Sequence, residues 1–240
     1  SFPTRRSSDL MLVIGALLVI QLRLRQAQAL LACVVLALTP WMQGSSLVGG
    51  HGLFIHYFTH SEVTWGFLLL ALMAAHAGRW SWAAALAGLV FDINAFIGVW
   101  LLVMLLAAYA AAPPQRAGRQ LLIAGLIFLL CAAPVLLWIA QSTGTTYPAF
   151  SFKNYIRAYF PYHFLIESAS MRDVLILGML LGVGCTAALL LQRPVFWLAV
   201  LMAPAGLFML GTVVPYLLNH RLVFNLHLLR IDGVIQWLAM

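Results

Sequence analysis

The segment at residues 82–112 reads WAAALAGLVFDINAFIGVWLLVMLLAAYAAA, an apolar run interrupted by FDIN at residues 91–94. As a single tilted helix it would place Asp92 near the middle of a bilayer, where an unpaired carboxylate costs several kcal/mol. As two short helices that meet at FDIN, it would hold Asp92 in a polar or protein-lined turn, as irregular backbone at membrane depth requires. We therefore predict a helical hairpin that turns at these residues.

The rest of the chain has the same apolar character. Of its 240 residues, 64% are hydrophobic and 8% are charged, whereas about 25% are charged in a typical soluble domain. The 13 Lys and Arg and 6 Asp and Glu residues are too few to cover the surface of a water-soluble particle of this size. We predict an all-α fold, a polytopic bundle of transmembrane helices.

A helix needs about 20 apolar residues to cross the hydrocarbon core, so we expect about eight spanning or half-spanning helices. They are residues 10–22, 27–42 and 64–78, the two halves of 82–112, and residues 120–140, 173–192 and 194–218, with a truncated apolar run after residue 232. Because the apolar runs at both ends are short, we expect the sequence to be a fragment truncated at both ends.

Residues 1–10 (SFPTRRSSDL) are polar and basic, and they stop abruptly at an apolar run. They match, codon by codon, the translated tail of a widely used sequencing adapter. We expect this segment to be non-native, and residues 11–240 to form a single, incomplete multi-pass membrane domain.

The net charge is +7, but the basic residues stand singly between apolar runs, which argues against nucleic-acid binding. The hairpin would place one set of cations inside the cell, as the positive-inside rule favours: Arg23, Arg25, Arg79, Arg116, Arg119 and Arg193. It would leave a second set outside, namely Lys153, Arg157, Arg172, Arg221 and Arg230. A single span over 82–112 would place a larger excess of Lys and Arg on the inside. The positive-inside rule therefore mildly favours the single span over the hairpin.

Residues 43–63 contain His51, His56, His60 and Glu62. On a helix, His56 and His60 would share a face, which suits a divalent metal, but no second pair of ligands is spaced to complete a site. We therefore predict no metal, and the alternatives left open are a polar external pocket or a plain membrane interface. Cys33, Cys131 and Cys185 each lie inside an apolar run, which predicts buried thiols and no disulfide.

Asp92 is a functional candidate because carboxylates inside a membrane are rare and costly. It stands with Asn94 between Gly88 and Gly98. Asp and Asn also satisfy the free N–H groups at a helix start, so a cap on the second helix of the hairpin is the alternative, and both roles can coexist.

The most informative segment is FKNYIRAYFPYHFLIES at residues 152–168. It contains Lys153, Arg157, Tyr159, Tyr162, His163 and Glu167. Aromatic faces, charged donors and a titratable nitrogen are what a sugar or phosphate group requires. The alternative is an amphipathic helix in the headgroup region. Because Pro161 argues against one continuous helix, periodicity does not show whether Arg157 and His163 share a face.

Residues 219–232 (NHRLVFNLHLLRID) place Arg230 and Asp232 just before an apolar run. These two residues mark a span boundary, or Arg230 binds a lipid-linked phosphate. The chain has no Gly-rich phosphate loop, no Ser-centred nucleophile elbow and no His-Glu-x-x-His motif. We predict no cofactor, and any enzyme here must act on a substrate that the membrane or its outer face delivers.

Residues 56–116, HYFTHSEVTWGFLLLALMAAHAGRWSWAAALAGLVFDINAFIGVWLLVMLLAAYAAAPPQR, resemble a module of GT-C-type polytopic membrane glycosyltransferases and of uncharacterised bacterial multi-pass membrane proteins. In that module a span ends in a basic turn, a small-residue helix follows, and a break at a polar position precedes a second short helix. Here the turn is Gly78-Arg79-Trp80, the small helix contains Ala87-Gly88-Leu89, and the break is Asp92-Ile93-Asn94. RAYFPYHF at residues 157–164 and LHLLRIDGVIQW at residues 226–237 resemble two further segments of such proteins.

The resemblance implies a transferase of the bacterial cytoplasmic (inner) membrane that moves a sugar from a polyprenyl-phosphate carrier at the external face. Arg157 and Arg230 would then hold the phosphate, and Tyr159, Tyr162 and His163 would line the sugar site. The acidic base of such enzymes lies in a first external loop that would precede residue 11, so the catalytic residues stay unassigned. The alternatives are a transporter or flippase of amphiphilic substrates and a non-catalytic membrane subunit, with membrane lipids as partners in every case.

Overall fold

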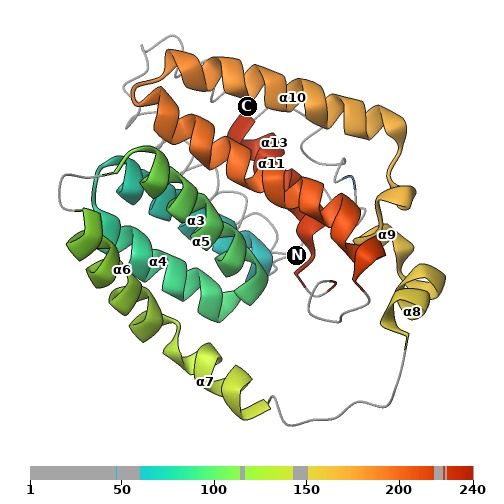
Figure 1. The fold of residues 1–240 in the computed structure, drawn as a ribbon, viewed down its shortest axis with the longest axis horizontal. Helices are drawn as coiled ribbons and strands as arrows, with labels where there is room; N and C mark the ends of the chain where they lie inside the picture. Colours follow the sequence, from blue (N-terminus) through green and yellow to red (C-terminus); the bar gives the residue numbers. More distant parts are fainter. Residues whose placement is uncertain are drawn as a thin grey trace, which may run out of the picture.

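The computed structural model describes residue 47 and residues 60–113, 117–142, 151–218, 224 and 226–239. Within them the regular elements are all helical (Figure 1), which confirms the all-α prediction for this part of the chain. The elements are α3 (His60–His76), α4 (Trp80–Ile93), α5 (Ala95–Ala111), α6 (Ala117–Cys131), α7 (Ala133–Ser142), α8 (Phe152–Tyr159), α9 (Pro161–Phe164), η2 (Ile166–Ser168), α10 (Met171–Leu190), α11 (Pro194–Leu217), η3 (Leu228–Ile231) and α13 (Asp232–Ala239). The helices predicted at residues 10–22 and 27–42, and the adapter-like residues 1–10, lie outside the described residues.

The predicted hairpin is confirmed. Asn94 alone separates α4 from α5, and the two helices run back along each other, so that the Trp80 ring lies 4.8 Å from the Tyr109 ring. The Asn94 side chain accepts hydrogen bonds from the amides of Phe96 and Ile97 at 3.2 and 3.3 Å. The polar break therefore supplies the N-cap of α5.

Two glycines bring the neighbours of α4 close to it. A Cβ built on Gly98 of α5 would lie 2.5 Å from the Cα of Phe91, and a Cβ on Gly88 of α4 would lie 2.5 Å from the Cβ of Cys131 in α6. Small residues at helix contacts permit the tight packing that drives helix association in lipid, where the hydrophobic effect between helices is absent. Helix α4 consequently packs directly against both α5 and α6.

The span predicted over residues 120–140 consists of two helices, α6 and α7. The chain breaks at Ala132, and α6 and α7 are bent by 66°. Pro134, in the first turn of α7, explains the bend, because proline lacks an N–H and its ring displaces the carbonyl of the preceding turn.

Helices α10 and α11 confirm that residues 173–192 and 194–218 are largely helical, and the two helices run antiparallel (Figure 1). By length and hydropathy these two helices can cross a membrane, and the bent pair α6–α7 taken together would make a third span. Helices α3, α4 and α5 are apolar but have only 17, 14 and 17 residues. Two to three full-length candidate spans are therefore found in the described residues, where the sequence predicted about eight spanning or half-spanning helices for the whole chain.

The outward sides of α6, α10 and α11 are apolar. Leu130, Met179 and Leu190 expose 76%, 63% and 85% of their surface. No charged residue follows Asp173 in α10, and α11 contains none. Large exposed apolar surfaces mark interaction sites, among them membrane contacts, and together with the candidate spans they indicate membrane association.

The buried core lies where α3, α4, α5 and α11 meet, and α13 packs against α10 and α11. Phe196 at the start of α11 and Leu101 and Met104 in α5 are fully buried. The core fixes how the helix ends align, and with them the polar groups at each end.

One end of the bundle, which we call the arginine end, contains Arg79, Arg119 and Arg193. The Arg193 guanidinium donates to the carbonyl of His76 at the end of α3. The side-chain amide of Gln120 in α6 donates to the carbonyl of Gly78 at 3.5 Å. These bonds bring the α3–α4 turn together with the α10–α11 turn and the start of α6.

The opposite end, which we call the polar end, contains Asp92, Asn94, the start of α3 and the segment 151–170. The Asn94 side chain donates to the hydroxyl of Ser61 at 3.3 Å, and Lys153 contacts the last turn of α11. The hairpin thus returns the chain as predicted, with Arg79 and the aromatic segment at opposite ends.

Candidate functional site

The segment 151–170 folds against the C-terminal end of α11 (Figure 1). The Ser151 hydroxyl caps α8 by accepting from the amide of Asn154 at 3.4 Å. Helix α8 ends at Tyr159 and α9 begins at Pro161, so the predicted interruption at this proline is confirmed. The apolar side of α8 is buried through Ile156, which packs with Leu165 and Phe224 in a small separate core.

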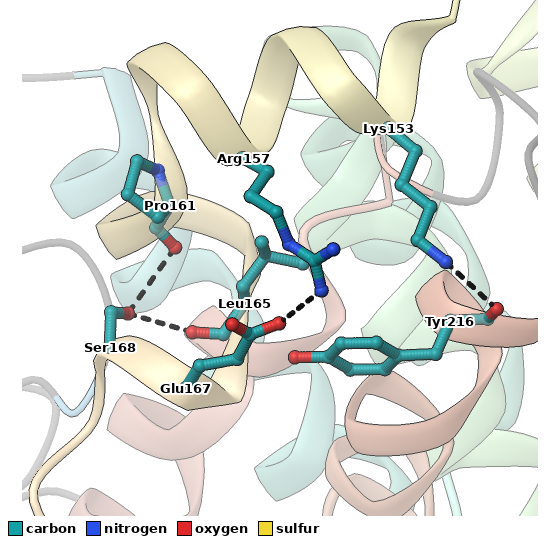
Figure 2. Close-up of polar contacts among 7 residues, drawn as sticks. All are labelled: Lys153, Arg157, Pro161, Leu165, Glu167, Ser168 and Tyr216. Atoms are coloured by element: carbon teal, nitrogen blue, oxygen red, sulfur yellow. Dashed lines mark hydrogen bonds and ion pairs between the residues drawn. The ribbon is translucent and has the colours of Figure 1, made fainter.

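An ion pair stands at the centre of this segment (Figure 2). Nη2 of Arg157 donates to Oε1 of Glu167 at 2.8 Å, and the two side chains are 52% and 49% exposed. This hydrogen bond is the main reason that the pKa of Glu167 lies below its ordinary value, against an opposing effect of partial burial. The same bond raises the pKa of Arg157. Exposed ion pairs of this kind contribute little to stability.

A second cation lies one helical turn before Arg157. Nζ of Lys153 donates to the backbone carbonyl of Tyr216 at 3.1 Å and stands 5.7 Å from the centre of the Tyr216 ring. Residues four apart share a helix face, so both cations point toward the last turn of α11, as Figure 2 shows. The result is two positive groups at the end of a candidate membrane span.

The position of Glu167 depends on the turn between α9 and η2. The Ser168 hydroxyl lies 2.7 Å from the carbonyl of Leu165 and 3.2 Å from that of Pro161. These contacts close the turn beneath α8 and hold Glu167 opposite Arg157 (Figure 2). The fold of the segment 151–170 therefore holds Glu167 in place as the hydrogen-bond partner of Arg157.

Exposed aromatic rings occupy another part of α8. Tyr155, Tyr159 and Phe160 are 38%, 65% and 37% exposed. The Tyr155 ring lies 5.1 Å from the Tyr159 ring and 5.8 Å from the Phe160 ring. Tyr155 and Tyr159 each stand two residues from a cation, so they lie on a different face of α8 from Lys153 and Arg157. The rings there are able to stack on a sugar or to lie among lipid headgroups.

The C-terminal segment reaches the same end of the bundle. The His227 ring lies 4.5 Å from Phe164 in α9 and 5.2 Å from Phe96 in α5. A cavity of about 10 Å³ adjoins it, which is space for about one water. Arg230 lies half-buried in η3 and, among the described residues, belongs to no ion pair.

Asp92 has a different role from the cap that the sequence suggested. The cap of α5 is Asn94, whereas Oδ1 of Asp92 accepts from the amide of Val135 at 3.4 Å. That amide belongs to the first turn of α7, where N–H groups are free and the helix dipole favours negative charge. Asp92 therefore joins the hairpin to the bend between α6 and α7.

The remaining predicted site residues are described in part or not at all. His56 lies outside the described residues. The side chains of His60 and Glu62, at the start of α3, and of Tyr162 and His163, in α9, also lie outside them. Within the described residues, no three His, Cys, Asp or Glu side chains gather as a metal site would require.

No known protein family, curated protein or solved structure matches this chain. The polar end of the bundle carries the side chains that bear on function. Its geometry adds one residue that sequence reasoning missed, Tyr216, whose carbonyl holds Lys153. A tyrosine at the end of an apolar run is typical of the membrane interface, and that signal could have drawn attention to it.

Proposed function

We propose that this protein is a polytopic integral membrane protein whose polar end binds the phosphate of a lipid-linked substrate. The observation that supports this most is the pair Lys153 and Arg157, one helical turn apart at the C-terminal end of α11. A helix that spans the hydrocarbon core ends at the level of the lipid headgroups. A lipid-linked phosphate would lie at that same depth.

The two cations suit a phosphate in complementary ways. The Arg157 guanidinium is a planar fork of donors that can bind two phosphate oxygens at once, while the Lys153 ammonium acts as a point charge. Phosphate would displace Glu167 from Arg157, and the carboxylate would be released to solvent. The exposed rings of Tyr155 and Tyr159, on a different face of α8, would lie among the lipid headgroups.

The reaction that best suits this arrangement is the sugar transfer implied by the GT-C resemblance. An acceptor hydroxyl would attack the anomeric carbon of a polyprenyl-phosphate sugar, and the bond from that carbon to the phosphate oxygen would break. The hydroxyl proton would leave to a carboxylate base, as the GT-C resemblance implies. Lys153 and Arg157 would stabilise the negative charge on the departing polyprenyl phosphate.

Polyprenyl phosphate binding tests the proposal. The protein would be reconstituted in nanodiscs of neutral lipid, and its affinity for polyprenyl phosphate would be measured by native mass spectrometry. Hydrogen bonds to charged groups contribute about 1.5–3 kcal/mol, so Arg157→Gln should weaken binding roughly 10- to 100-fold. Arg157→Lys should fall between wild type and Arg157→Gln, because it keeps the charge but loses the fork.

The matched control is Arg172→Gln, which removes an exposed arginine from the first turn of α10 at the same end. It should leave the affinity within about twofold of wild type, since the loss of a distant exposed charge is screened. Equal losses in Arg157→Gln and Arg172→Gln would mean that α8 is only an interfacial helix.

A transporter or flippase of amphiphilic substrates is the second candidate. Helices α4 and α5 are short and meet at a polar break, and α6–α7 is bent by 66°. Transporters commonly build their substrate sites from discontinuous helices. In proteoliposomes loaded with a labelled lipid-linked sugar, movement of the intact molecule across the bilayer would favour this candidate, and transfer of the sugar to an added hydroxyl acceptor would favour the transferase.

A further inference from the structure

Three helices enclose an apolar groove near the arginine end, remote from the proposed phosphate site. Its floor is formed by Ala83, Ala84 and Ala87 of α4, its walls belong to α5 and α6, and its cavity measures about 90 Å³. The groove exists because alanine side chains are too short to fill the space between the neighbouring helices. Leu106 and Leu121, which flank it on α5 and α6, are 47% and 43% exposed, so the groove opens to the outside of the bundle.

The lining and depth of the groove suit a hydrocarbon chain. Its walls are almost wholly carbon, and an apolar cavity of this kind stays dry because water needs polar partners. The floor extends from Trp80 to Ala87, about 10 Å at 1.5 Å per residue. One leaflet of the hydrocarbon core is about 15 Å thick, so the groove covers roughly two-thirds of a leaflet, starting at Trp80 near the arginine end.

Two cations stand where the groove meets the arginine end. Arg79 directly precedes Trp80, and Arg119 lies two residues before Leu121 in the first turn of α6; both are exposed. The bond from Gln120 to the carbonyl of Gly78 brings these two turns side by side. No acidic residue occurs in the described parts of the α3–α4 turn, the start of α6 or the α10–α11 turn. The local charge is therefore positive and uncompensated.

We propose that this groove binds one acyl chain of an anionic phospholipid, with the headgroup phosphate between Arg79 and Arg119. Basic pockets between transmembrane helices bind anionic headgroups in this way. A zwitterionic lipid could place the same chain in the groove, but its headgroup would gain less from the two arginines. The proposal thus commits to a lipid with net negative charge.

Gly125 provides a variant that fills the groove. It lines the wall on α6, and a Cβ built there meets no atom within 4 Å, so the side chain of Gly125→Leu begins in open space at the groove. Gly182→Leu is the matched control, because Gly182 of α10 is also exposed, also has no atom within 4 Å of a built Cβ, and does not line the groove. Both substitutions carry the same gain in helix propensity.

The experiment titrates the purified full chain in neutral detergent with phosphatidylglycerol or phosphatidylcholine of identical acyl chains, and native mass spectrometry counts the lipids bound. Wild type should prefer phosphatidylglycerol, Gly125→Leu should lower its affinity at least tenfold, and Gly182→Leu should match wild type. Arg79→Gln combined with Arg119→Gln should remove the preference between the two lipids.

Two results would overturn the proposal. One is a wild-type protein that binds both lipids equally. The other is a Gly125→Leu variant that binds phosphatidylglycerol as wild type does, which would mean that another segment of the chain fills the groove. The double arginine variant changes only exposed side chains, so it tests the headgroup contact even where Gly125→Leu alters folding.

Discussion

Gly98→Ala tests the contact on which the hairpin depends. A methyl group at this position would lie 2.5 Å from Cα, 2.7 Å from Cβ and 2.9 Å from the backbone nitrogen of Phe91, whereas ordinary van der Waals contact begins at 3.4 Å. Because these atoms belong to the backbone or are fixed to it, no side-chain rotation removes the clash. Helices α4 and α5 would have to separate by about 0.9 Å, enough to forfeit up to half of the dispersion energy between the facing atoms.

The magnitude follows from two opposing effects. Adding a methyl group to a packed core costs about 1–3 kcal/mol, and a clash with backbone belongs at the upper limit. Replacing glycine by alanine inside a helix gains about 1 kcal/mol. We expect Gly98→Ala to lower the free energy of unfolding by about 2 kcal/mol.

The assay is reversible unfolding by sodium dodecyl sulfate in mixed micelles, followed by far-ultraviolet circular dichroism. Gly178→Ala in α10 is the control, since a Cβ there meets no atom within 4 Å, and it should be unchanged or more stable by up to about 1 kcal/mol. If Gly98→Ala is as stable as Gly178→Ala, the two halves of residues 82–112 do not pack at Phe91, and the hairpin geometry is wrong.

Asp92→Ala should destabilise the bundle by about 1 kcal/mol in the same assay, because the Val135 amide loses its acceptor; Asp92→Asn, which keeps an oxygen, should lose less, and equal losses would contradict the role of that bond. The Arg157–Glu167 contact should be fully present above pH 4.5, the ordinary pKa of Glu, and should disappear as the pH falls through the lower pKa that Glu167 has in the folded chain. A nitroxide on Asn154→Cys should therefore become more mobile in acid, and adding Glu167→Gln should abolish this pH dependence; an unchanged acid response would assign it to another group. In a background without Cys33, Cys131 and Cys185, an impermeant maleimide should reach Ser151→Cys and Gly118→Cys from opposite sides of the membrane, and labelling of both from one side would contradict the hairpin.

The amino-acid sequence was sufficient to predict those helices and helix breaks that neighbouring residues in the chain determine. Helices α10 and α11 follow from the length of their apolar runs and from Arg193-Pro194 between them. The hairpin follows from the cost of a carboxylate inside an apolar run, and the interruption of the aromatic segment follows from Pro161. Each of these inferences needs only residues that are adjacent in sequence.

The partners of these elements could not be predicted from neighbouring residues. The sequence offers Asp92 as a functional candidate or as a cap on α5, but its carboxylate accepts from the amide of Val135, 43 residues away. The bend at Ala132 was missed, because an apolar run of sufficient length predicts a span whether or not Pro134 bends it. Arg157 and Glu167 are ten residues apart, and no helical period relates residues on either side of a break.

Hydropathy therefore predicts where membrane-spanning helices lie along the chain, because each residue type has its own free energy of transfer to hydrocarbon. Hydropathy does not specify which faces of the helices meet, since an apolar face is equally compatible with lipid and with another helix. In the sequence, nothing distinguishes Ala83, Ala84 and Ala87 from other helix residues. They form the floor of a groove only because α5 and α6 both pack against α4. That arrangement depends on the close approaches at Gly88 and Gly98, which exist only once the helices have packed.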